Sequence, residues 1–297
     1  MEIGQVLDGR FELEEPLGDD AIAQVWRARD LQLDRRVVVR RLHERLLADE
    51  AVFDRFRLEA EAAARLSHGH VASLFDVAIG DGLAYTVGEY VDGPSLARLI
   101  EDGPLVATVV AAIGSQAALG LAAAHQVGIV HRDVRPGNLL IGRDGRVRIV
   151  DFGSARIPDP SGVHGDAGIT RSEVYLAPEQ LEEGVIGTDR SDVYALGRVL
   201  TRALDGASVG SHPDADGEGL VVRVLGAIPG LPLSSSPETQ LRELLAQATD
   251  PDPDRRPGAE TLADALQVLY DRRADEVLRQ LAERLPVTDY GRRPSER

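Results

Sequence analysis

His131-Arg132-Asp133-Val134-Arg135-Pro136-Gly137-Asn138 opens a segment near the middle of this chain that ends in Asp151-Phe152-Gly153. Between these two polar motifs lie two short apolar runs, 139–141 and 147–149, which have the length and composition of strands. Asp144-Gly145 separates the runs, and this dipeptide favours a tight hairpin turn. A hairpin brings the residues before its first strand close to those after its second. We therefore expect Asp133, Asn138 and Asp151 to converge on one cleft.

This pair of motifs resembles the catalytic loop and the metal-binding tripeptide of protein kinases, specifically the bacterial eukaryotic-like serine/threonine kinases. Phosphoryl transfer depends on positioning and on charge stabilisation around an in-line displacement. The resemblance implies that Asp133 accepts the proton of the substrate hydroxyl and that Arg135 stands where the family has a catalytic lysine. It also implies that Asn138 and Asp151 hold the Mg²⁺ ions bound to ATP.

The resemblance covers nearly the whole chain, which argues against a chance match in an acidic protein. Strands are expected at 11–17, 25–29, 36–42, 72–79 and 83–87, and a helix is expected at 49–66. Beyond the catalytic loop, Ala177-Pro178-Glu179 matches a further family motif, and Arg256 is the expected partner of Glu179. Asp192 resembles the residue that supports the catalytic loop from beneath.

The fold expected from these matches is α+β, a two-lobed protein kinase-like fold in residues 1–272. Residues 1–90 would form a small N-lobe with an antiparallel sheet plus helix C. Residues 91–272 would form a larger, mainly helical C-lobe, and 273–297 a C-terminal helix and tail. A chain of 297 residues is long enough to bury the core that such a fold needs.

Composition narrows the possible partners and location. The net charge of −16 argues against a nucleic-acid partner, because basic surfaces hold phosphate backbones. The absence of cysteine excludes disulfide scaffolds and fits a reducing, cytoplasmic location. Residues 105–124 carry no charge and are long enough to span a bilayer. Their alanine-rich composition favours a helix buried in the larger lobe, so no membrane span is expected.

The nucleotide site implied by the resemblance draws on the glycine-rich loop, the first strands, helix C and the hinge. Its expected residues are Leu17, Gly18, Val25, Val38, Arg40, Glu59, Gly88, Glu89 and Val91. Glu59 stands at the position of the helix-C glutamate, and Glu89 and Val91 belong to the hinge that meets adenine.

Several of these positions depart from the family pattern. The chain contains no lysine, so Arg40 and Arg135 occupy the two positions where the family relies on lysine. A planar guanidinium on a longer stem does not fit the site of a compact ammonium. In the glycine-rich loop, Asp20 replaces a glycine and adds repulsion against a polyanion. Gly88 occupies the gatekeeper position, where its missing side chain should open a pocket behind the adenine.

The matching motifs and the altered positions together allow three functions. A catalytic group misplaced by about 1 Å can cost ~100-fold, and overpacking of a fitted site adds ~1 to 3 kcal/mol. A loss of roughly 10³ to 10⁴ from a turnover of ~1 to 100 s⁻¹ follows. The favoured function is an attenuated serine/threonine protein kinase that transfers phosphoryl groups from Mg-ATP to protein hydroxyls.

The alternative is a pseudokinase, a regulatory module that binds a protein partner with or without nucleotide. A kinase-fold enzyme acting on a small molecule is disfavoured, because Ala177-Pro178-Glu179 and the loop before it resemble protein-substrate machinery. Within that loop, Thr170 is the best candidate for a regulatory phosphate, which Arg132 would bind.

Overall fold

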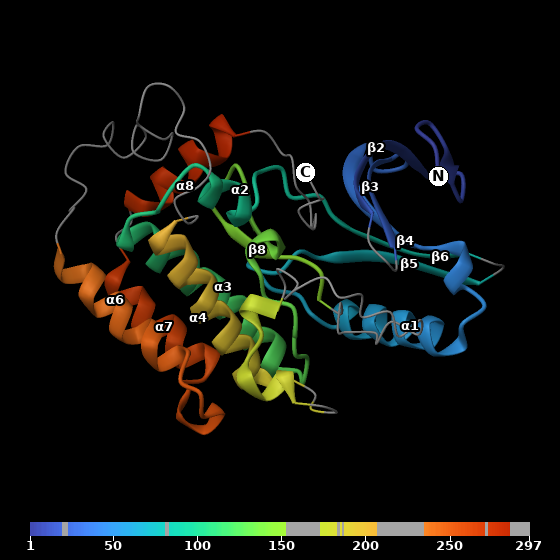
Figure 1. Cartoon of the computed structure of the whole chain (residues 1–297). Coiled ribbons are helices and arrows are strands. Elements are labelled where there is room, and N and C mark those ends of the chain that lie inside the picture. Colours follow the sequence, from blue (N-terminus) through green and yellow to red (C-terminus); the bar gives the residue numbers. More distant parts are fainter. Residues whose placement is uncertain are drawn as a thin grey trace.

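The chain folds into two lobes, a sheet-rich N-terminal lobe and a larger helical lobe, joined near residue 90 (Figure 1). The computed structural model describes residues 1–19, 23–80, 83–152, 173–182, 185, 187–206, 235–270 and 273–285. The expected α+β, two-lobed architecture is confirmed. Asp20, Thr170 and the expected tail at 286–297 lie outside the described residues.

The small lobe is built on a six-stranded antiparallel sheet with one helix beside it. The strand order is β1-β2-β3-β4-β6-β5. The elements are β1 (Val6–Leu7), β2 (Phe11–Asp19), β3 (Ala23–Asp30), β4 (Arg35–Leu42), the helix α1 (Glu50–Ala64), β5 (Leu74–Gly80) and β6 (Leu83–Glu89). All five strands expected from the sequence are present, and the short β1 was not expected.

The valine run of β4 contributes to two apolar clusters, one on each face of the sheet. Val37 and Val39 point into the core of the small lobe, where they pack with Trp26 and Tyr85. Val38 lies on the opposite face and joins a separate apolar cluster at the cleft between the lobes. Because successive strand residues face opposite sides, one uninterrupted valine run can supply both clusters.

The larger lobe packs its helices around a central buried helix, α3 (Ala107–Gln126). The other elements are α2 (Leu96–Glu101), the strands β7 (Leu139–Ile141) and β8 (Val147–Ile149), α4 (Asp189–Asp205), α6 (Ser235–Ala248), α7 (Ala259–Leu269) and α8 (Arg273–Arg284). In the part of the chain that the structure describes, α3 is the one helix that is both long enough and apolar enough to cross a membrane. However, 78% of its most apolar 18-residue stretch is buried in the protein. Its burial matches the core helix that its composition predicted.

The last helix, α8, is part of the core of the larger lobe. Ala274, Val277, Leu278 and Leu281 are buried in the same cluster as Ile141 and Val147 of the hairpin. At its end, the Glu283 carbonyl accepts a hydrogen bond from Arg143 Nη1 at 3.4 Å. The C-terminal helix expected from the sequence therefore packs against the β7–β8 hairpin.

Candidate active site

The β7–β8 hairpin forms as the sequence predicts, with Leu139 opposite Ile149 and Ile141 opposite Val147. A 3₁₀ turn, Pro136–Asn138, leads into the first strand. The Val150 amide donates to the Asn138 carbonyl at 3.0 Å, which joins the chain just before β7 to the chain just after β8. Asn138 and Asp151 are therefore neighbours at the open end of the hairpin.

The Asp133 carboxylate is held by two residues of its own loop. Its Oδ2 accepts hydrogen bonds from Arg135 Nε at 3.0 Å and from Asn138 Nδ2 at 3.1 Å. Asn138 Nδ2 also donates to the Asp133 carbonyl at 2.9 Å. These contacts bring the three expected catalytic side chains together and orient the carboxylate. Its other oxygen, Oδ1, has no hydrogen bond to a described residue and can accept a proton.

The site contains an oxygen atom that suits a divalent cation. Asn138 is fully buried, and its Oδ1 has no hydrogen-bond partner among the residues that the structure describes. A buried acceptor of this kind costs about 1 to 3 kcal/mol unless something satisfies it. Mg²⁺ binds oxygen ligands and takes few of them from the protein, the rest coming from phosphates and water. The amide oxygen of Asn138 and the carboxylate of Asp151 therefore fit the Mg²⁺ that the resemblance implies.

The backbone on both sides of the site adopts uncommon conformations. Arg132 and Asp151 have φ values of +64° and +62°, in the left-handed region. Such residues cost on the order of 1 to 3 kcal/mol each and persist only where the surroundings hold them. For Arg132 the support is Asp192, whose carboxylate accepts the Arg132 amide at 2.7 Å and the His131 amide at 2.8 Å. The expected supporting role of Asp192 thus has a direct geometric basis.

His131 connects the two motifs beneath the site. Its Nε2 donates to the Val150 carbonyl at 2.9 Å, and its Nδ1 accepts the Asp133 amide at 3.2 Å. Its ring meets Phe152 edge to face, with the ring centroids 4.6 Å apart. A side chain that bonds to both motifs fixes their separation, so the catalytic and metal-binding groups are held as one unit.

An apolar cluster lines the cleft between the lobes. Leu17, Val25 and Val38 of the small lobe pack together with Leu140 and Val150 of the larger lobe. Val91 of the connecting segment belongs to the same cluster. Apolar side chains above and below a slot are the usual setting for a flat aromatic base. Four of the expected nucleotide-binding residues, Leu17, Val25, Val38 and Val91, thus lie in one place.

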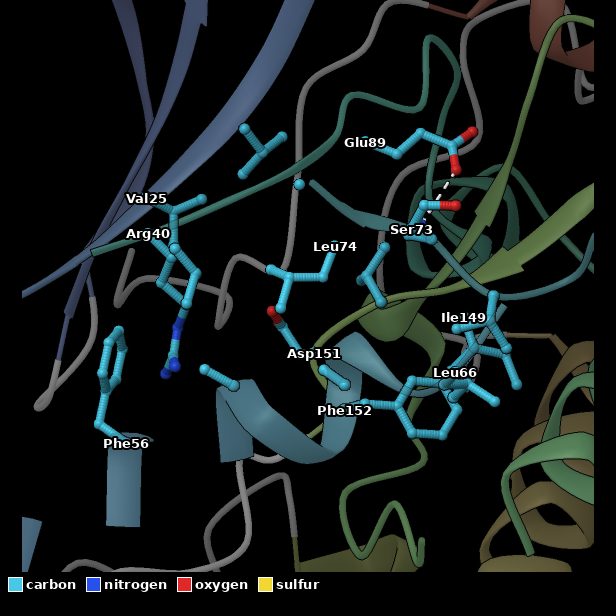
Figure 2. A pocket seen from close by; sticks show the side chains of 18 residues that line it. Val25, Arg40, Phe56, Leu66, Ser73, Leu74, Glu89, Ile149, Asp151 and Phe152 are labelled. Carbon is cyan, nitrogen blue, oxygen red and sulfur yellow. Dashed lines mark hydrogen bonds between the residues drawn. The ribbon is translucent and has the colours of Figure 1, made fainter. Parts of the chain in front are cut away.

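A cavity of about 120 Å³ extends behind this cluster. Gly88 lies in its wall together with Thr86, and α1 contributes Phe56, Ala60 and Ala63. The space expected beside a glycine at position 88 is present, and an adenine in front of it stays a prediction. Figure 2 shows Arg40 and Asp151 directed into this cavity from opposite lobes. Arg40 and Asp151 therefore line the same cavity between the lobes.

The remaining predicted residues are less fully described. Gly18 lies near the end of β2, beside Val25 of β3. The next residue, Asp19, accepts a hydrogen bond from Gln24 at 3.2 Å and approaches His43 Nε2 at 3.1 Å. Glu59 lies on α1, but its side chain is outside the described part of the structure. Its expected pairing with the residue at position 40 stays a prediction.

The ion pair expected between Glu179 and Arg256 is confirmed. Arg256 Nη1 and Nη2 contact the two carboxylate oxygens at 2.7 and 2.8 Å, and the Arg256 side chain is fully buried. Partial burial raises the pKa of Glu179, but the hydrogen bonds from Arg256, the Glu179 amide and Ser191 together outweigh it and hold this pKa below its usual value. The pair ties Ala177-Pro178-Glu179 to the base of the larger lobe.

Sequence reasoning missed one feature of the site, an ion pair between Glu89 and Arg148. Arg148 Nε lies 2.8 Å from Glu89 Oε1, although the two residues come from different lobes. The signal available in the sequence was weak. Arg148 is a charged residue between two apolar residues of a short strand. This alternation indicates that its side chain faces away from the core, but it does not identify a partner.

Comparison with known proteins places these features in a family. The model of the protein kinase domain family matches residues 11–267. The serine/threonine-protein kinase PknL of Mycobacterium tuberculosis is 33% identical over 296 residues, covering 96% of this chain and 69% of that protein. PrkC of Bacillus subtilis is 37% identical over 207 residues, covering 69% of this chain and 32% of PrkC. A crystal structure of the Mycobacterium tuberculosis PknI kinase domain superposes with a TM-score of 0.66 and 26% identity, covering 91% of this chain and 99% of that domain.

The chain spans only part of several relatives. It covers 37% of a probable serine/threonine-protein kinase of Clostridium perfringens, to which it is 35% identical over 256 residues.

Proposed function

This chain belongs to the protein kinase family, and we propose that it is a serine/threonine protein kinase of low turnover that uses Mg-ATP to phosphorylate protein hydroxyls. The observation that carries the proposal is the buried, unpartnered Oδ1 of Asn138 beside the oriented carboxylate of Asp133. A scaffold without nucleotide chemistry has no use for this arrangement, since an orphaned buried acceptor destabilises the fold.

In the proposed reaction the substrate hydroxyl oxygen attacks the γ-phosphorus of ATP, the bond to the β,γ-bridging oxygen breaks, and ADP leaves. Asp133 accepts the hydroxyl proton, and its loop neighbours keep the carboxylate turned toward the cleft. Arg135, paired with Asp133, adds positive charge where charge builds up on the phosphoryl group. Mg²⁺, when bound, neutralises phosphate charge, and Asn138 and Asp151 are the residues that would hold it.

The low turnover follows from Arg40. Its guanidinium carries the charge of the family's lysine, but it is planar and sits on a longer stem. It therefore presents that charge to the phosphates from a different position, and about 1 Å of displacement is worth ~100-fold in rate. Arg40→Lys should accelerate phosphoryl transfer by at least about tenfold.

A pseudokinase that regulates a protein partner is the second candidate function. Its support is the number of altered positions around the expected nucleotide site, with Asp20, Arg40 and Gly88 all departing from the family pattern. In this role the fold would bind its partner with nucleotide as a structural ligand or with none. We propose a cytoplasmic location for either function, because a cysteine-free chain suits a reducing environment.

One experiment separates the two functions. The purified protein is incubated with Mg-ATP and a generic protein substrate, and phosphate incorporation is measured by mass spectrometry beside Asp133→Asn. Incorporation that disappears in Asp133→Asn and rises in Arg40→Lys supports the kinase. No incorporation over hours in any of the three proteins supports the pseudokinase.

A further inference from the structure

The Arg148 guanidinium joins the two lobes through one carboxylate. Arg148 lies on β8 of the larger lobe, and its Nε contacts Glu89 Oε1 at 2.8 Å, where β6 of the small lobe ends. The other oxygen of Glu89 accepts the Ser73 amide at 3.2 Å, and the Glu89 amide donates to the Ser73 carbonyl at 2.8 Å (Figure 2). Glu89 is thus held by the small lobe while it binds the larger one.

The same guanidinium holds a second carboxylate inside its own lobe. Arg148 Nη1 and Nη2 donate to Asp144 Oδ1 and Oδ2 at 3.1 and 2.9 Å. Asp144 lies in the connection between β7 and β8, so this pair stays within the β7–β8 hairpin. Arg148 therefore forms one ion pair between the lobes and one within a lobe, and the two pairs can be removed separately.

Backbone pairing continues the connection beside this side chain. The Ala72 amide donates to the Ile149 carbonyl at 2.9 Å, and the Ile149 amide donates to the His70 carbonyl at 2.9 Å. The segment 70–73, which leads from α1 to β5, therefore runs along β8 as a short parallel partner. Any rotation between the lobes at this point must break either these bonds or the ion pair.

We propose that Arg148 is a positioning residue that sets the hinge against the metal-binding end of the hairpin, and that its pair with Glu89 thereby strengthens nucleotide binding. Glu89 begins the segment expected to meet the base, and Asp151 follows Arg148 two residues after the end of β8. The ion pair fixes the separation between these two contact points before ATP arrives. This inference rests on the proposed binding of Mg-ATP.

The expected effect is modest, because both partners are partly accessible to water. The side chains of Arg148 and Glu89 are 17% and 27% exposed. Ion pairs near the surface contribute little to stability, so the gain here comes from preorganisation of the nucleotide site. We expect removal of the Glu89 charge to weaken Mg-ATP binding about fivefold.

Two isosteric variants of the full chain separate the two bonds of Arg148. Glu89→Gln removes the charge on the interlobe side and keeps an oxygen for the Ser73 amide. Asp144→Asn removes the charge on the hairpin side and keeps an oxygen for the Arg146 amide, which Asp144 Oδ1 accepts at 3.1 Å. Calorimetric titration measures the affinity for Mg-ATP, and hydrogen exchange of the amides of residues 72, 73 and 89 is followed without nucleotide.

The inference is supported when Glu89→Gln weakens Mg-ATP binding about fivefold and speeds exchange at these amides, while Asp144→Asn leaves both within twofold of the parent. It is overturned when the two variants change affinity equally, or when Glu89→Gln exchanges like the parent. A parent protein that binds no Mg-ATP contradicts the proposed kinase function instead. The exchange measurement then still decides whether the pair holds the lobes together.

Discussion

Gly145 provides a sharp test of how α8 packs against the hairpin. It lies in the turn between β7 and β8 with φ at +77°, where only glycine is unstrained. A Cβ atom at this position would lie 2.9 Å from the Asp275 carbonyl oxygen and 3.2 Å from Arg279 Cγ, both on α8. Gly128 is a matched control, because its φ is +78° and a Cβ there would meet nothing within 4 Å.

The two alanine variants should differ by the cost of the contact alone. A left-handed conformation costs a non-glycine residue roughly 1 to 2 kcal/mol. Replacing glycine also lowers the conformational entropy of the unfolded chain, which offsets about 0.4 to 1 kcal/mol of that cost. Gly128→Ala should therefore lower the free energy of unfolding by about 1 kcal/mol. Gly145→Ala carries the same cost and must also displace a backbone carbonyl, which adds ~1 to 3 kcal/mol. Its total loss should be about 2 to 4 kcal/mol.

Urea unfolding followed by far-ultraviolet circular dichroism measures both losses, since the larger lobe contains most of the helices. Hydrogen exchange across 273–284 then locates the damage, and faster exchange is expected in Gly145→Ala but not in Gly128→Ala. Equal losses in the two variants, within about 0.5 kcal/mol, would refute the close approach of α8 to the turn. In that case α8 would not stabilise the hairpin through contact with its turn.

Three further predictions concern the core, the pH dependence and the cavity. Arg256→Ala leaves the Glu179 carboxylate without its buried partner and should cost about 3 to 5 kcal/mol in unfolding free energy; a loss below 1 kcal/mol would contradict the pair's structural role. The Arg10 guanidinium binds the buried Asp30 carboxylate and lowers the pKa of Asp30 to about 2. Because this pKa lies below the usual value, the pair stabilises the fold at neutral pH, and its contribution is lost as pH falls from about 5 toward 2. Arg10→Met should remove that part of the acid sensitivity in melting temperatures recorded across this range, and an unchanged pH profile would count against it. Ala60→Val places two more carbons in the cavity behind Gly88 and should raise stability by about 1 kcal/mol; a lower melting temperature would show that the space is not free.

The hairpin and its motifs could be predicted because their signals are local. Asp144-Gly145 is a turn former between two apolar runs, and the strands form where these runs lie. Once the hairpin closes, the positions of Asn138 and Asp151 follow from the register. The expected convergence of the site was therefore a consequence of a few neighbouring residues.

The presence of a cavity beside Gly88 could be predicted from the sequence, but the residues that line it could not. A missing side chain at that position indicates space, but the lining depends on which face of α1 meets the sheet. Phe56, Ala60 and Ala63 form that face. Helical periodicity gives the spacing of such residues, whereas the rotation of the helix against β5 and β6 is a property of the assembled lobe.

By itself, the sequence determined strands β2 to β6 of the small lobe, the hairpin, the buried α3 and the residues that meet at the hairpin's open end. Each of these depends on turn chemistry, apolar periodicity or a short motif, all of which act between residues close in the chain. Only the tertiary structure decided the pair between Glu89 and Arg148 and the docking of α8 on the turn at Gly145. Those contacts join distant segments, and they form only after the packing of whole lobes has set the distance and direction between two side chains.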